Sequence, residues 1–93
     1  MDGTQRFNQF TIHYFSWVRE RVGRDSEQVS VPVEVTDISG LIDWLIASDD
    51  ESYAHAFEHR RVIRAAIDHH HACHTMPLCG ATEVAFFPPV TGG

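Results

Sequence analysis

Hydrophobic and polar residues alternate with a period of two in several short segments of this chain. Phe10, Ile12 and Tyr14 alternate with polar residues, which predicts a half-buried strand that begins near Asn8 or Gln9. Further strands are predicted at residues 28–35, 62–68 and 83–87. Pro32 lies within the second of these strands and favours an edge position for it, because proline cannot donate a ladder hydrogen bond.

A helical period follows the first predicted strand. Phe15, Val18 and Val22 are spaced i, i+3 and i+7, which predicts a short helix with one apolar side. Ser16 could cap the start of this helix and Gly23 could end it.

The main predicted helix follows Asp37, which is a suitable N-cap residue. Its apolar stripe consists of Ile38, Leu41, Ile42 and Leu45. Gly40 in the first turn costs about 1 kcal/mol relative to alanine, so packing must hold this helix in place. A second helical segment is expected at residues 52–58, and residues 69–80 are expected to be rich in turns.

The order of these elements predicts an α+β fold in a single domain that spans residues 1–93. One principal helix is expected to pack across one face of a sheet. A chain of this length can bury one modest hydrophobic core, roughly 60–65% of its unfolded surface.

Composition narrows the range of functions. The net charge is −6, which argues against nucleic-acid binding, because phosphate contacts need clustered cations. All seven basic residues are arginine, so lysine chemistry and self-conjugation through lysine are excluded. No apolar run approaches the ~18–20 residues of a membrane span, and no signal-peptide pattern is found, so a cytoplasmic location is expected. In a reducing cytosol, Cys73 and Cys79 are expected to be free thiols.

The sequence closes on a candidate reactive group. Pro88 and Pro89 favour an extended, flexible tail over residues 88–93, with a reach of roughly 19 Å at ~3.1 Å per residue. Gly92 and Gly93 carry no side chain, so a narrow active site could close around them. The Gly93 carboxylate is ionised at neutral pH and could attack the α-phosphate of ATP to form an acyl adenylate. Such an adenylate is open to sulfur or nitrogen nucleophiles.

The last predicted strand carries aromatic residues on both faces. Val84 and Phe86 point one way, whereas Ala85 and Phe87 point the other. If one face of the sheet is covered, one of the two phenylalanine rings lies on exposed surface. We expect Phe86 or Phe87 to act there as a partner-interface anchor.

Residues 83–93 resemble the ending of the small, sulfur-carrying subunit of molybdopterin synthase. That family ends in Phe-Pro-Pro-Val, then Ser or Thr, then Gly-Gly, and this chain has the Thr form. Weaker similarity extends over residues 11–93, notably at residues 14–23, 66–68 and 77–78. The chain departs from the family pattern at residues 81–83, where Gly-Asp-Glu is usual, and at Asp68, where Asn is frequent.

The resemblance implies a ubiquitin-like β-grasp fold and a role as a sulfur carrier in molybdenum cofactor biosynthesis. An E1-like enzyme would consume ATP to adenylate Gly93, and a sulfurtransferase or persulfide donor would convert it to a thiocarboxylate. The tail would then insert into the large synthase subunit and donate sulfur to cyclic pyranopterin monophosphate, within a heterotetramer. The inserted residues would be Pro88, Pro89, Val90, Thr91, Gly92 and Gly93. On this interpretation the chain is a non-catalytic co-substrate without a bound cofactor.

Two kinds of alternative stay open. The same tail chemistry serves sulfur carriage for thiamine, tRNA thiolation or cysteine synthesis, and conjugation to protein lysines. A different class is a metal-binding interaction module built on the residues His55, His59, His69, His70, His71, Cys73, His74 and Cys79. Consecutive histidines point in alternating directions and no paired Cys/His spacing is present, so an exposed polar hairpin is favoured and no metal site is assigned.

Overall fold

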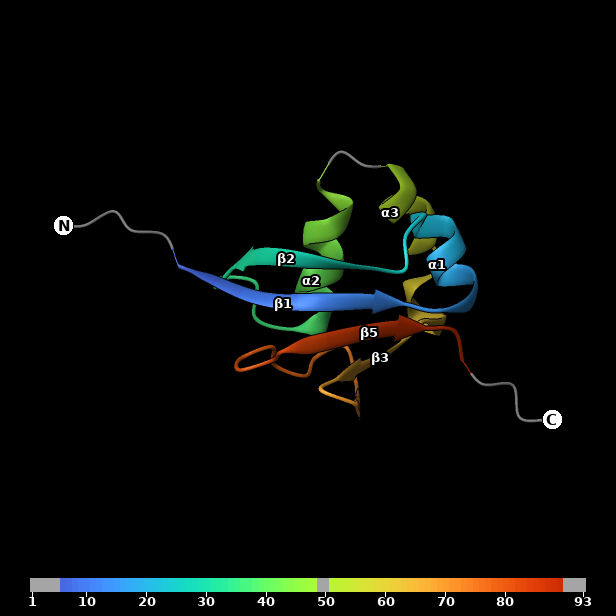
Figure 1. Cartoon of the computed structure of the whole chain (residues 1–93). Coiled ribbons are helices and arrows are strands. Elements are labelled where there is room, and N and C mark those ends of the chain that lie inside the picture. Colours follow the sequence, from blue (N-terminus) through green and yellow to red (C-terminus); the bar gives the residue numbers. More distant parts are fainter. Residues whose placement is uncertain (1–5, 49–50, 90–93) are drawn as a thin grey trace.

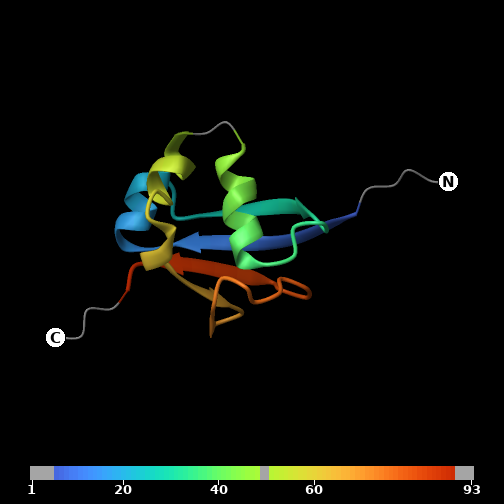
Figure 2. The ribbon, with the colours of Figure 1, turned by 180° about the vertical axis from the view of Figure 1, so that it is seen from behind.

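The computed structural model describes residues 6–48 and 51–89, and it shows one mixed sheet with helices on one side. The strands are β1 (Phe7–Tyr14), β2 (Ser26–Pro32), β3 (Arg64–Ile67), β4 (His70–Ala72) and β5 (Glu83–Phe87). The helices are α1 (Ser16–Val22), α2 (Ile38–Ile46) and α3 (Glu51–Ala56), together with a 3₁₀ turn, η1 (Arg60–Val62). Figure 1 views the sheet with the helices behind it, and Figure 2 views it from the helix side. The predicted α+β class is confirmed.

The first and last strands pair in parallel at the centre of the sheet. The strand order is β2-β1-β5-β3-β4, and Ile12 pairs with Val84 and Tyr14 with Phe86. The other neighbouring strands are antiparallel. Because β1 and β5 run in the same direction, the C-terminal ends of both strands lie at the same end of the sheet, beside α1 (Figure 1).

The core lies between the sheet and the helices. Every second residue of the two central strands faces it, namely Phe10, Ile12, Tyr14, Val84 and Phe86. The predicted stripe of α2 is confirmed, since Ile38, Leu41, Ile42 and Leu45 are all buried. None of the described helices is long and apolar enough to span a bilayer.

Of the three residues predicted to cap or end a helix, two do so in the structure. The Asp37 carboxylate accepts the Gly40 N–H at 2.8 Å, which confirms the predicted N-cap of α2. A Cβ at Gly40 would lie 3.2 Å from the Asp37 Oδ1 atom, which gives a reason for glycine there. Gly23 ends α1 with φ 90°. The predicted Ser16 cap is wrong, because Ser16 is the first helical residue and Phe15 occupies the N-cap without a side-chain bond.

Three strand predictions need correction. β2 ends at Pro32, not at residue 35, because the Val35 N–H turns back and donates to the Pro32 carbonyl. Its predicted edge position is confirmed. β3 begins at Arg64, because residues 60–62 form the 3₁₀ turn and leave Val62 exposed. The short strand β4 lies in the segment that was expected to be rich in turns, and no strand was predicted there.

A two-residue turn joins β3 to β4 and holds the start of β5. Its residues, Asp68 and His69, both have positive φ, 49° and 72°, as the tight turns of hairpins require. The Asp68 carboxylate accepts the backbone N–H groups of Glu83 at 2.8 Å and of Thr82 at 2.9 Å. These bonds favour the ionised form and hold the pKa of Asp68 below its usual range. The two places where the chain departs from the family pattern therefore contact each other.

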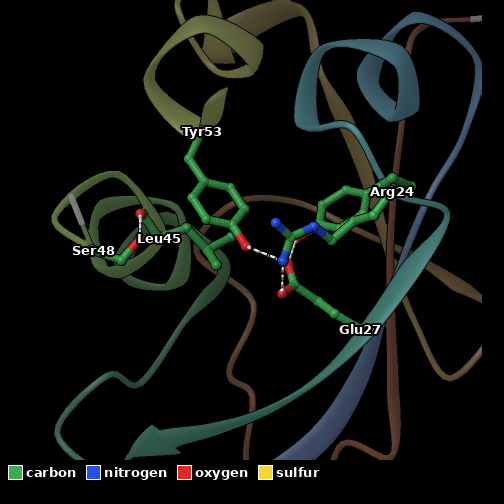
Figure 3. Close-up of polar contacts among 6 residues, drawn as sticks. Arg24, Glu27, Leu45, Ser48 and Tyr53 are labelled. Carbon is green, nitrogen blue, oxygen red and sulfur yellow. Dashed lines mark hydrogen bonds and ion pairs between the residues drawn. The ribbon is translucent and has the colours of Figure 1, made fainter. Parts of the chain in front are cut away.

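One carboxylate joins β1, β2 and α3 at the margin of the core. Glu27 accepts hydrogen bonds from the hydroxyls of Tyr14, at 2.7 Å, and of Tyr53, and pairs with Arg24 at 2.9 Å. Figure 3 shows Arg24 and Tyr53 converging on Glu27. Burial, followed by the hydrogen bond to the Glu27 carboxylate, raises the pKa of Tyr14 well above its ordinary value.

We expect Tyr14→Phe to lower the free energy of unfolding by about 1–3 kcal/mol, because the Glu27 carboxylate loses a buried donor. Urea denaturation at neutral pH measures this loss. An unchanged midpoint and slope would show that the Tyr14 hydroxyl contributes nothing to stability.

The same variant tests the raised pKa of Tyr14. Its folded pKa lies above the unfolded one, so its stabilising contribution is complete below pH ~10 and declines as the pH rises above that value. Denaturation at a series of pH values should show a steeper alkaline loss of stability in the wild-type chain than in Tyr14→Phe. Parallel curves would contradict the assignment.

Candidate functional site

The predicted reactive end of the chain falls mostly outside the described residues. Val90, Thr91, Gly92 and Gly93 belong to that part, so their roles stay predictions. Pro88 and Pro89 are described: they follow β5 without regular secondary structure and are half-buried. The site that can be built from geometry is therefore the base of the tail, where β5 ends.

Phe86 anchors this base from the helix side of the sheet. Its ring is fully buried, stacks on Tyr14 with centroids 6.3 Å apart, and meets Phe57 edge-on at 5.0 Å. Its carbonyl accepts the N–H of Phe15 at 3.1 Å. The prediction of Phe86 as an interface anchor is thus corrected, because a ring in the core offers a partner no surface.

Phe87 lies on the opposite side of the sheet, as the alternation in β5 predicts. Its ring is half-buried and makes an edge-to-face contact with His71 at 5.5 Å. Of the two rings considered for partner binding, only Phe87 is accessible. It immediately precedes Pro88, so anything that binds the tail at its base also comes close to this ring.

The side of the sheet away from the helices, here called the open face, carries a hollow of about 230 Å³. Its lining residues are His13, Phe15, Ala66, His69, Glu83 and Ala85. Ala66 and Ala85 pair across β3 and β5, and their small side chains leave room above the sheet. Phe15 forms a wall, is 49% exposed, and stacks on His13 with ring centroids 6.5 Å apart.

The sequence did not identify this hollow. The periodicity of α1 assigned Phe15 to a buried helix stripe, but as the N-cap residue it turns outward. Alternation from Phe10, Ile12 and Tyr14 does place His13 on the open face. The pairing of β3 with β5, which puts Ala66 beside Ala85, leaves no signal in one sequence.

One carboxylate, that of Glu83, lines the hollow. Glu83 Oε1 lies 3.3 Å from His69 Nε2 and 3.7 Å from His13 Nε2. Apart from this carboxylate and the imidazoles, the lining is apolar. The hollow can therefore receive an apolar side chain from a partner, which is the usual chemistry of an interface anchor.

The histidine-rich segment does not gather into a metal centre. His70 contacts the Asp68 carbonyl at 3.0 Å and His74 contacts the Ile63 carbonyl at 2.9 Å. α3 ends at Ala56, so His55 lies on this helix and His59 lies beyond it. Within residues 6–48 and 51–89, no group of three or more His, Cys, Asp or Glu side chains is placed to hold a metal ion.

Both cysteines are free and exposed, as predicted. The Cys73 Sγ atom lies 3.1 Å from the Thr75 hydroxyl, and this hydrogen bond lowers the pKa of the Cys73 thiol. Neither thiol lies in the hollow on the open face.

Comparison with known proteins shows consistent similarity. The model of the ThiS family matches residues 12–93. The molybdopterin synthase sulfur carrier subunit of Escherichia coli is 36% identical over 82 residues, which cover 88% of this chain and 96% of that protein.

Solved structures agree on the fold. SAMP1 from Haloferax volcanii superposes with a TM-score of 0.67 at 21% identity, over 92% of this chain and all of that chain. A Pyrococcus furiosus protein, provisionally described as molybdopterin converting factor subunit 1, gives 0.65 at 18% identity, over 88% and 98%. These likenesses confirm the ubiquitin-like β-grasp fold.

Alanine substitutions at the two phenylalanines of β5 should lower the free energy of unfolding by different amounts. Phe86→Ala removes a fully buried ring and is expected to cost about 3–5 kcal/mol of unfolding free energy. Phe87→Ala, from the open face, should cost clearly less and leave a folded domain. Thermal and urea denaturation of both variants test this, and equal losses would contradict the separation of the two rings.

Proposed function

The chain belongs to the ThiS family, and we propose that it is the sulfur carrier of a molybdopterin synthase. The observation that carries this proposal is the 36% identity with the E. coli sulfur carrier subunit over almost its whole length. The Phe-Pro-Pro-Val-Thr-Gly-Gly ending, at residues 87–93, favours this member of the family over carriers for thiamine, tRNA thiolation or cysteine synthesis.

The proposed chemistry takes place at the Gly93 carboxyl group. A carboxylate oxygen attacks the α-phosphate of ATP on an E1-like enzyme, and pyrophosphate leaves. A persulfide from a sulfur donor attacks the acyl adenylate, AMP leaves, and a thiol then cleaves the resulting acyl disulfide to give the thiocarboxylate. The carrier finally donates this sulfur to cyclic pyranopterin monophosphate in the large synthase subunit.

The chain's own contribution is to present this carboxyl group. The parallel β1–β5 pair and the buried Phe86 ring fix the base of the tail to the core. Pro88 and Pro89 restrict the chain beyond it, which lowers the entropy that insertion costs. The absence of lysine from the chain means that an activated carrier cannot acylate the lysine of another copy.

The open face is the surface we propose for docking to the large subunit. Exposed aromatic rings next to a concave apolar hollow are typical of interface hot spots. Phe87 and Phe15 flank the base of the tail, so a protein that engages the tail can cover both rings at once. A partner segment with one apolar side chain would fill the hollow.

Mass spectrometry tests the chemical step. After incubation with ATP, the activating enzyme and a sulfur donor, the intact chain should gain the mass difference between sulfur and oxygen. A chain that lacks Gly93 should not gain it. Absence of the gain in the wild-type chain, while a known carrier gains it in parallel, would refute the proposal.

Titration with the large subunit tests the docking surface. Phe15→Ala and Phe87→Ala should each weaken binding about tenfold or more, as loss of an interface anchor does. Phe7→Ala is the matched control, because Phe7 is equally exposed, at 48%, but lies at the opposite end of β1. Affinities of Phe15→Ala and Phe87→Ala equal to that of Phe7→Ala would exclude the part of the open face at the base of the tail as the docking surface.

A further inference from the structure

Arg61 and Arg64 share a property with Arg6 that the other arginines of this acidic chain lack: within residues 6–48 and 51–89, they are exposed and have no ion-pair partner. The rest have a clear role: Arg19, Arg24 and Arg60 pair with carboxylates, and Arg21 lies over the Trp17 ring. We call Arg61 and Arg64 the basic edge.

The basic edge lies at the base of the tail. Arg64 pairs directly with Phe87 across β3 and β5, and Pro88 follows Phe87. Arg64 and Ala66 share one face of β3, and Ala66 lines the hollow, so Arg64 belongs to the open face. Arg61 and Arg64 together line a second, shallow hollow of about 290 Å³.

This placement has an energetic consequence for docking. A protein that covers the Phe87 ring also removes water from the Arg64 guanidinium opposite it. Burying an unpaired charge is unfavourable unless the partner supplies an opposite charge with hydrogen bonds. Because no carboxylate within residues 6–48 and 51–89 pairs with Arg64, the partner must supply one.

We propose that the basic edge docks on an acidic surface of the large subunit, beside the opening that receives the tail. This inference rests on the proposed function and names the chemistry of the partner surface. Arginine suits the role, because its planar fork binds a carboxylate through two parallel hydrogen bonds. The contact would orient the carrier, since the Glu83 carboxylate lines the hollow on the same face and repels the same acidic surface.

The contact is expected to act mainly on encounter. Complementary charges at the rim of an interface raise the association rate, and salt screens them over a Debye length of about 10 Å at 0.1 M. The chain carries a net charge of −6, so its overall field opposes an acidic partner. The basic edge would supply the local attraction that selects one docking orientation.

Charge reversal tests the proposal. Association of the full-length chain with the large subunit of the same organism is followed at low and high salt. Arg64→Glu should weaken binding about tenfold or more, chiefly through slower association at low salt, and Arg61→Glu should act in the same direction. Arg64→Lys, which keeps the charge, should recover most of the association rate.

Arg6→Glu is the matched control. It makes the same change of charge at an exposed arginine that precedes β1, at the opposite end of the sheet, and should leave binding nearly unchanged. Unaltered melting temperatures would show that the reversals do not act through folding. If Arg64→Glu binds as the wild type does, or if Arg6→Glu weakens binding as much, the inference is overturned.

The wild-type chain separates this inference from the function on which it rests. If the wild-type chain neither gains sulfur nor binds the large subunit, the proposed function fails and the inference fails with it. If it does both and the reversals have no effect, only the acidic docking surface is refuted.

Discussion

The parallel pairing of the first and last strands is the constraint on which the rest of the structure depends. β1 and β5 occupy the centre of the sheet, and their registered pairs, Ile12 with Val84 and Tyr14 with Phe86, lie in the core. The base of the tail is therefore not a loose terminus of the domain. It continues directly from a strand that is paired on both sides and carries the buried Phe86 ring.

The two faces of the sheet have different properties. The helix side supplies stability through the core and through the Glu27 cluster, in which two tyrosines and one arginine satisfy a largely buried carboxylate. The open face bears the half-buried ring of Phe87 and a hollow that the exposed ring of Phe15 helps to line. Because residues alternate along each strand, substitutions can alter one face and spare the other, and a docking surface can vary without loss of the core.

Much of the fold could be predicted from the sequence, because it follows from local periodicity. The apolar stripe of α2, the Asp37 cap and the alternation in β1 and β5 are local signals, and all three are present in the structure. The wrong bounds of β2 and β3 arose at local turns, whereas two other errors arose where nonlocal contacts decide. The N-cap of α1 is Phe15 and not Ser16, because the Phe15 N–H is bound to the Phe86 carbonyl. β4 is a strand only through its pairing with β3. The hollow and the basic edge depend on which strands are neighbours, and a single sequence does not contain that information.

The central position of β5 has a consequence for synthesis of the chain. Residues 83–87 leave the ribosome after all the other strands, and until they arrive β1 and β3 have no partner along their facing edges. Pairings so distant in sequence form slowly, and unpaired edges attract other strands. The sheet can thus be completed only after residues 83–87 have left the ribosome. A nascent chain that stops before residue 83 would lack the middle of its sheet, and its two unpaired strand edges would expose it to quality-control proteases.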